Sequence, residues 1–243
     1  MNIDRGLWVT WYDLPAAHRE VYFAWLHDNY IPHVLARPGV SWAAHYAAET
    51  DPVYSGAKGR LKRTRDALVP GGTRFILIFG GDDPGVFVDP APAQMHAALP
   101  DQGRSLLGLR SGVRSAILLE QARVDGPEAP RFSGPAPCIQ LGSYNSAAYE
   151  DEDELADWYE QWYLASCARV SGCIRARKLV SVSGWAKHAV LFEFESLDAR
   201  NGIFVSREAA YPQRAAWTDK VVRRLIHAPG SPAVARRIGP AVA

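Results

Sequence analysis

The sequence repeats itself, and this repetition constrains the fold more than any other feature of the chain. Residues 25–46 align without a gap with residues 158–179, and a second window, 79–88, resembles 194–205 with two extra residues in the second copy. Two matching windows in the same order predict an internal duplication with a unit of about 110 residues. The identical positions in the first window are Trp25 and Trp158, Tyr30 and Tyr163, Gly39 and Gly172, and Ala43 and Ala176.

The composition indicates a globular protein without a strongly charged partner. Hydrophobic residues make up 48% of the 243 residues, which is enough for a substantial core in one large domain or two small ones. The formal net charge of +1 gives no reason to expect nucleic acid or an acidic membrane surface as a partner. The 8 Trp, 10 Tyr and 8 Phe residues fill cores, but such residues also line pockets for flat, apolar ligands.

Neither the cysteines nor the apolar segments predict an extracellular or membrane protein. The three cysteines, Cys138, Cys167 and Cys173, are odd in number and form no C-x-x-C pair, so we expect no disulfide framework and no zinc site. The first residues lack the basic and long apolar regions of a secretory signal, and no stretch approaches 18 apolar residues. We therefore expect a cytoplasmic protein.

Each half of the chain predicts the element order β-α-β-β-α-β. Apolar residues at spacings of three and four predict a helix that begins near Pro15 and ends at Pro38-Gly39, and a weaker helix over 93–107 that is broken near Pro100. In the second half the same spacing predicts helices over 151–168 and 217–226. Short apolar stretches predict strands at 7–12, 40–46, 74–80 and 113–121 in the first half, and at 138–144, 173–180, 188–194 and 233–238 in the second.

The two halves are separated by residues 125–137, a stretch with four prolines and two glycines that predicts a linker. We therefore predict a first repeat over 1–124 and a second over 138–243. Each ferredoxin-like unit forms a four-stranded antiparallel sheet with both helices on one face, and its other face must also be covered. Two copies cover each other sheet to sheet, which predicts an α+β barrel with the helices outside and a central cavity between the sheets.

The motif around the first helix resembles that of a known family. Residues 25–32 read W-L-H-D-N-Y-I-P and are followed by Pro38-Gly39 and a strand that ends at His45-Tyr46. This pattern is similar to the W-Y-x-x-x-H-x-P and P-G motif of the dimeric α/β barrel superfamily, in its EthD-like branch. The second repeat carries the weaker form W-Y-E-Q-W-Y-L-A, so the resemblance covers most of the chain and implies a tandem duplication.

One position departs from the family pattern. The family histidine two residues before the proline is Tyr30 here and Tyr163 in the second repeat. A phenol is neutral at pH 7, where an imidazole titrates, so a mechanism that needs a base at this position is not carried over. The family includes isomerases, lyases, polyketide cyclases and cofactor-free monooxygenases.

His45 is the leading candidate for a general base. It lies in the second predicted strand, where one sheet face is expected to look into the cavity. Tyr30 and Tyr12 are the candidate hydrogen-bond donors to a developing oxyanion. The alternative is that His45 lies on the helix-facing side of its strand or at the rim.

Six further residues are candidates for substrate binding. His27 and His33 flank Tyr30 at three-residue spacings, although both can equally face solvent. Arg175 and Arg177 alternate onto one strand face, where a guanidinium holds a carboxylate if that face lines the cavity; otherwise they lie at an edge. The remaining two are Trp42 and Trp8. His27 and His33 are six residues apart rather than four, so we expect no metal site, and we expect no cofactor.

The loop over 51–73 is the main difference between the repeats, since it is 18 residues longer than its counterpart. It carries the basic residues Lys58, Arg60, Lys62, Arg63 and Arg65. Such a loop is either a lid that suits an anionic substrate or a solvated insertion.

These observations predict a cofactor-independent enzyme that acts by proton transfer on a small, apolar, aromatic or carbonyl-bearing metabolite. The reaction class would be that of a lyase, isomerase or cyclase. One alternative is a non-catalytic small-ligand-binding or scaffold protein, and another is a haem-binding enzyme like chlorite dismutase. We expect no nucleic acid and no membrane as partners, and the protein can form a homodimer through helices or edges.

Overall fold

The protein is a closed β-barrel with helices packed on its outside. The computed structural model describes residues 4–50, 61–204 and 212–240, and within them ten strands form one sheet. Eight of these strands make the barrel wall. The first repeat supplies β1 (Gly6–Asp13), β2 (Val40–Ala48), β4 (Phe75–Gly81) and β5 (Ser111–Asp125), and the second supplies β6 (Cys138–Ser146), β7 (Cys173–Ser183), β8 (His188–Phe194) and β10 (Ala233–Gly239).

The strand order confirms two ferredoxin-like repeats joined edge to edge in one chain. The order is β2-β4-β1-β5 in the first repeat and β7-β8-β6-β10 in the second, and all of these pairs are antiparallel. Strand β5 pairs with β7, and β10 pairs with β2 as well as with β6, so the sheet closes on itself. The predicted α+β barrel is therefore confirmed.

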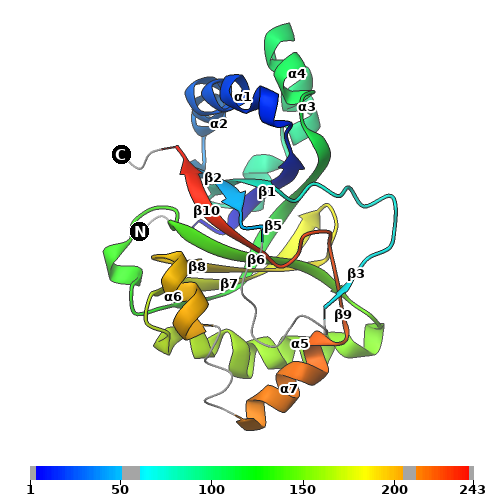
Figure 1. Cartoon of the computed structure of the whole chain (residues 1–243), viewed down its shortest axis with the longest axis vertical. Helices are drawn as coiled ribbons and strands as arrows, with labels where there is room; N and C mark the ends of the chain where they lie inside the picture. Colours follow the sequence, from blue (N-terminus) through cyan, green and yellow to red (C-terminus); the bar gives the residue numbers. More distant parts are fainter. Residues whose placement is uncertain (1–3, 51–60, 205–211, 241–243) are drawn as a thin grey trace.

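The helices gather at the two ends of the molecule, with the barrel between them (Figure 1). In the first repeat, α1, a π-helical turn and α2 follow one another without a break, and α3 and α4 are separated near Pro100 as predicted. The second repeat is similar, and α5 continues into a π-helical turn and a 3-10 turn. The bounds are α1 (Arg19–Trp25), α2 (Ile31–Leu35), α3 (Pro92–Ala97), α4 (Asp101–Leu107), α5 (Glu152–Trp158), α6 (Leu197–Ala199) and α7 (Pro212–Val222).

The two repeats share the same irregularity at the same aligned positions. A π-helical turn spans Leu26–Tyr30 in the first repeat and Tyr159–Tyr163 in the second. Such turns are rare, and one residue more per turn places side chains five apart on one face. The Trp25 and Tyr30 rings stack across the first turn with centroids 5.4 Å apart, and the aligned pair in the second repeat stacks at 4.1 Å. The identical tryptophan and tyrosine of the repeated window are therefore the pair that packs across this turn.

The aligned glycines that follow these helices, Gly39 and Gly172, have the same structural role. Gly39 has φ +82° and Gly172 has φ +79°, a left-handed conformation that residues with a β-carbon rarely adopt. A β-carbon on Gly39 would lie 2.7 Å from Val86 Cγ1. Both glycines therefore allow the tight turn from the helix into the second strand of each repeat.

Two predicted segments differ from the structure. The predicted helix over 217–226 is wrong at its end, because α7 stops at Val222 and β9 (Leu225–His227) pairs with β6. Sheet pairing overrides the helical spacing there. In the long basic loop, residues 51–60 lie outside the described residues, whereas β3 (Lys62–Arg63) pairs with β9 in parallel.

The inside of the barrel is packed rather than hollow, which corrects the predicted central cavity. Side chains alternate across the strands, so Leu7, Val9 and Trp11 point inward, as do Ala44 and Tyr46. These five expose between 0% and 3% of their surface. A hollow large enough for a ligand would leave accessible surface on its lining, and the apolar inner-face residues of the described strands show almost none.

One end of the barrel is filled by an ion-pair cluster. Arg177 is fully buried, and its Nη1 lies 3.0 Å from Asp4 Oδ2 and its Nε 2.5 Å from Glu120 Oε2. Arg123 bonds to both carboxylates as well. Burial raises the pKa of Asp4, but the charges of Arg177 and Arg123 outweigh this and leave that pKa below its ordinary value. Arg177 therefore neutralises carboxylates within the barrel, which corrects the expectation that its strand face lines a ligand cavity.

We predict that Arg177→Met lowers the free energy of unfolding by about 3–5 kcal/mol, because Asp4 and Glu120 lose a buried partner. Since the pKa of Asp4 is lowered by folding, its ion pairs stabilise the protein above its ordinary pKa, and this stabilisation is lost as the pH falls. The difference between wild type and variant in urea unfolding should therefore shrink in acid.

The matched control is Arg236→Met. Arg236 pairs with Glu49 at 2.6 Å, but its side chain is 63% exposed, so its loss should cost no more than about 1 kcal/mol. Equal losses in the two variants would contradict the role given to the buried cluster.

Candidate active site

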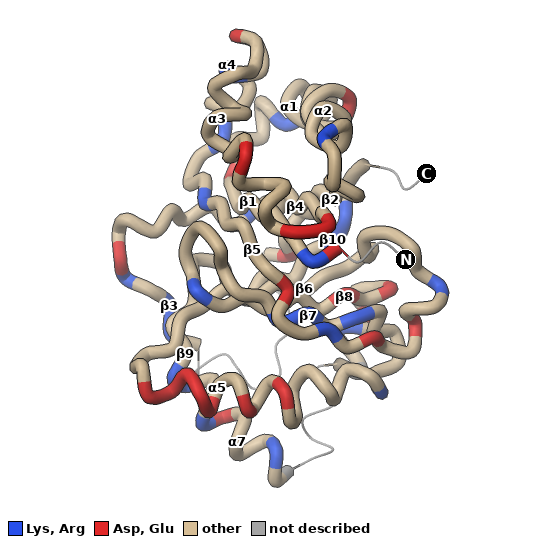
Figure 2. Tube along the Cα trace, turned by 180° about the vertical axis from the view of Figure 1, so that it is seen from behind, with Lys and Arg blue, Asp and Glu red and all other residues tan. Residues whose placement is uncertain are grey.

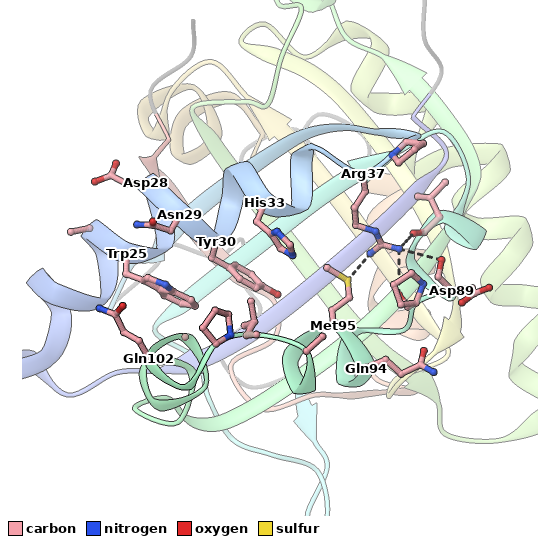
Figure 3. A pocket seen from close by; sticks show the side chains of 18 residues that line it. Trp25, Asp28, Asn29, Tyr30, His33, Arg37, Asp89, Gln94, Met95 and Gln102 are labelled. Carbon is pink, nitrogen blue, oxygen red and sulfur yellow. Dashed lines mark hydrogen bonds between the residues drawn. The ribbon is translucent and has the colours of Figure 1, made fainter.

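A cleft of about 1150 Å³ lies outside the barrel, between the helical segment of α1 and α2 on one side and α3 and α4 on the other. Figure 3 shows the side chains of Trp25, Tyr30 and His33 directed from the first segment towards Met95 and its neighbours. Trp25 and Tyr30 share this face because of the π-helical turn between them. The opposite wall is mainly apolar and includes Leu99, which lies between α3 and α4.

Tyr30 connects the cleft with a half-buried histidine. Its hydroxyl lies 2.7 Å from His96 Nε2 on α3, and its side chain is 2% exposed although it lines the cleft. Burial, and then the charge of Arg110, lowers the pKa of His96 to about 4, so its imidazole is neutral at pH 7. Burial raises the pKa of Tyr30 above its ordinary value. In the tautomer with its proton on Nδ1, His96 accepts the hydrogen bond from the Tyr30 hydroxyl.

Trp8 packs against the His96 ring of this pair. Its ring centroid lies 5.9 Å from that of His96 and 5.1 Å from that of Phe79, and its Nε1 donates to Ser115 Oγ at 2.8 Å. Trp8 is not among the residues that line the cleft. It therefore fixes the position of the imidazole and makes no direct contact with the cleft, which corrects its expected role in substrate binding.

Arg37 sets the width of the cleft at one end. Its Nη1 donates to Met95 Sδ at 2.6 Å and its Nη2 to the Val86 carbonyl at 2.5 Å (Figure 3). These bonds connect the segment after α2 to α3 and to the turn at Pro84–Phe87 that precedes it. Burial is the main reason that the pKa of Arg37 is lowered.

His45 lies in the helix-facing layer rather than in the barrel. Ala44 and Tyr46 point inward, so alternation places His45 outward, where it is fully buried beneath α1. Its Nε2 lies 2.7 Å from the Tyr12 hydroxyl and its Nδ1 2.9 Å from His27 Nε2. Both ring nitrogens are occupied, which corrects the expectation that His45 meets a substrate in a central cavity.

The chain of Tyr12, His45 and His27 does not border the cleft. Burial, and then the charge of His27, lowers the pKa of His45 to about 3, so the imidazole is neutral at physiological pH. Two of the predicted catalytic residues, Tyr12 and His45, thus contact each other, and they form a hydrogen-bonded chain with the half-buried His27, which was predicted to bind substrate. Tyr30 belongs to the separate pair with His96.

The remaining predicted residues are divided between the cleft and the barrel end. His33 is exposed and lines the cleft. Trp42 donates from Nε1 to Asp4 Oδ2 at 2.7 Å, and Arg175 Nε lies 3.4 Å from Glu193 Oε2 inside the barrel, so neither side chain meets the cleft. Residues 61–73, the described part of the basic loop, contribute nothing to its lining.

The described residues offer neither a preformed metal site nor a membrane-spanning helix. Over residues 4–50, 61–204 and 212–240, no group of three or more His, Cys, Asp or Glu side chains is arranged to hold a metal ion. Among the helices in these same ranges, none has both the length and the apolar character needed to cross a bilayer.

The sequence interpretation missed four residues of the cleft region, namely His96, Trp25, Met95 and Arg37. Trp25 carried a signal, since it is one of the identical positions of the duplication. His96 carried none, because nothing in its local spacing shows that α3 packs against Tyr30.

Known structures share this architecture over almost the whole chain. No family model matches, and no curated protein gives a significant sequence match. A putative monooxygenase from Fusobacterium nucleatum superposes with a TM-score of 0.60 at 10% identity, covering 98% of this chain and 94% of that chain. An anthrone oxidase-like protein gives 0.57 at 10% identity, covering 98% and 92%. A protein of the same description as the first, from Lactobacillus acidophilus, gives 0.53 at 9% identity, covering 96% and 94%.

The chain has the dimeric α/β barrel fold. Its two repeats form this closed barrel within one chain. At 9–10% identity the likeness establishes the fold and leaves the reaction to be argued from the site.

We predict that the barrel loses stability as the pH falls from about 7 to about 4, and that His45→Gln reduces this loss. The folded-state pKa of His45 is about 3 against an ordinary 6.5, so protons bind the unfolded chain preferentially in this interval. Glutamine preserves hydrogen bonding but does not titrate. Urea unfolding over this range measures the slope.

The control is His18→Gln, because His18 is exposed at the start of α1 and should leave the slope unchanged. An unchanged slope in His45→Gln itself would show that the buried chain does not contribute to acid sensitivity.

Proposed function

We propose that this barrel is an enzyme that binds a small, flat, largely apolar metabolite in the cleft and moves a proton through Tyr30 and His96. The observation that carries the proposal is Tyr30, a residue of the cleft wall whose hydroxyl lies 2.7 Å from the half-buried imidazole of His96. A hydroxyl in the wall of a cavity with a neutral base behind it is suited to acid–base catalysis.

The walls favour an aromatic or conjugated ligand. Trp25, Met95 and Leu99 supply apolar surface, while Asn29 and Gln102 place amide groups at the edges. Pockets for small molecules combine mainly apolar walls with a few polar groups that set the orientation, and this cleft is large enough for a ligand of several fused rings.

The proton path follows from the two pKa directions. Because burial raises the pKa of Tyr30, its hydroxyl remains protonated at rest. When the hydroxyl oxygen takes a proton from the substrate, its own proton passes to His96 Nε2, which is neutral and accepting. His45 is not the base in this relay, because both of its ring nitrogens are occupied within the helix layer.

The substrate class follows from the same chemistry. A carbon beside a carbonyl, or a phenol, is acidic enough to lose a proton to such a pair. This loss is a first step shared by isomerases, lyases and cofactor-free oxygenases. The names of the structural neighbours, monooxygenase and anthrone oxidase-like, support an oxidative outcome with molecular oxygen as co-reactant. The resemblance of residues 25–32 supports membership of the EthD-like branch as part of this proposal.

We predict that the purified protein accelerates exchange of the acidic methylene protons of anthrone with deuterated solvent, and that Tyr30→Phe slows this exchange by about 10²-fold or more. His96→Gln should slow it similarly, because the Tyr30 proton then lacks a basic acceptor. Proton nuclear magnetic resonance follows the exchange, and an oxygen electrode shows whether oxidation accompanies it.

Tyr163→Phe is the matched control, since Tyr163 occupies the aligned position in the second repeat and should leave exchange unchanged. Anthrone binding without catalysed exchange would favour a binding protein. Exchange that survives both Tyr30→Phe and His96→Gln would overturn the proposed relay.

A further inference from the structure

The second repeat contains a separate cavity with its own polar cluster. The cavity has a volume of about 580 Å³ and lies against the helix-facing side of β7 and β8, beside the start of α5. Its lining includes Lys178, His188, Glu152 and Lys187. None of these residues lines the cleft of the first repeat.

These residues form a hydrogen-bonded series that begins at an amine. Lys178 Nζ lies 3.0 Å from His188 Nδ1 and 3.0 Å from the Leu179 carbonyl oxygen, and the lysine is only 4% exposed. His188 Nε2 lies 2.9 Å from Glu152 Oε2, which also accepts from Lys187 Nζ at 2.5 Å. Figure 2 shows acidic residues along α5, where Glu152 begins the helix.

The Glu152 carboxylate determines which ring nitrogen of His188 carries the proton. Burial raises the pKa of Glu152, but hydrogen bonds from Lys187 and His188 outweigh it and lower this pKa to about 2. Next to a carboxylate, His188 donates from Nε2, so its Nδ1 accepts from Lys178. Burial is also the main cause that lowers the pKa of His188 to about 4.

The amine itself is poised between its charged and neutral forms at pH 7. Burial lowers the pKa of Lys178 to about 7; the charge of Glu152 opposes this change and that of Lys187 adds to it. A neutral amine has two hydrogens, and two acceptors are present, namely the Leu179 carbonyl and His188 Nδ1. The lone pair of Nζ then accepts no hydrogen bond, and Lys178 lines the cavity.

The duplication places this lysine at the position of His45. Residue 178 aligns with residue 45, and both point outward from the second strand of their repeat. His45 is enclosed by Tyr12 and His27, whereas Lys178 borders the cavity. The two repeats thus place different polar groups at one equivalent point.

We propose that Lys178 is a nucleophilic amine that forms an imine with a small aldehyde or ketone bound in this cavity, with His188 and Glu152 as its proton relay. Nζ adds to the carbonyl carbon, and a proton leaves the nitrogen for His188 Nδ1 while Glu152 stabilises the imidazolium. His188 returns this proton to the alkoxide oxygen, which gives the carbinolamine, and the second proton of the nitrogen then reaches the hydroxyl group by the same route. Water leaves as the C=N bond forms, so amine and carbonyl give imine and water without an oxidant.

The test is reductive trapping with benzaldehyde and sodium cyanoborohydride on the full-length protein at about pH 7. The hydride converts the imine to a stable benzylamine, and mass spectrometry of peptides assigns the label among the five lysines of the chain. We expect Lys178 to react at least about tenfold faster than Lys220, because an ordinary lysine is almost entirely protonated at this pH.

The pH profile separates a reactive amine from one that is merely accessible. Labelling of Lys178 should level off above about pH 7, whereas labelling of an exposed lysine such as Lys220 should continue to rise as the pH increases further. Labelling of Lys178 no faster than that of Lys220, or a profile that rises in parallel with it, would overturn the proposal without any variant.

Variants then test the relay. Lys178→Met should abolish the selective label, and His188→Asn should slow it while the circular dichroism spectrum stays native. Lys62→Arg is the matched control, since this lysine is exposed and lies outside the cavity, and it should leave the label on Lys178. Tyr30→Phe should not affect the label, so the two proposed sites succeed or fail separately. Unchanged labelling in His188→Asn would show that the histidine takes no part.

Discussion

Closure of the duplicated sheet on itself is the constraint on which the rest of the structure depends. An isolated ferredoxin-like sheet has two open edges and one uncovered apolar face. Pairing of β5 with β7, and of β10 with β2, removes both edges of each repeat at once. The uncovered faces then meet inside the barrel, where Trp11, Tyr46 and their aliphatic neighbours fill the space.

A filled barrel leaves the outer layer as the place for chemistry. Alternation along each strand sends every second side chain towards the helices, and Tyr12, His45, Lys178 and His188 all lie there. The ion pairs around Arg177 close one end of the barrel, so charged residues of the inner face serve stability. Both proposed sites accordingly lie outside the barrel wall, one among the helices of the first repeat and one between the sheet and α5 in the second.

Much of this organisation was available from the sequence, because local patterns decide it. Strands such as β8 match their predicted range because a short apolar run between turns specifies them, and the repeated window predicted the duplication. Period-two alternation shows that His45 and Tyr46 face opposite sides, but it does not say which side is the barrel. The contact between Tyr30 and His96 depends on how α3 packs, and no local pattern in the sequence reports it. The same holds for β9, where sheet pairing decides against a helical spacing.

The central claim is that apolar ligand space lies outside the barrel and not within it. A crystal structure under xenon pressure tests this claim directly, since xenon occupies apolar voids regardless of their function. We predict xenon density in the cleft beside Trp25, Met95 and Leu99, and none among the inner-face residues around Trp11 and Tyr46. Xenon bound among the inner-face residues would contradict it.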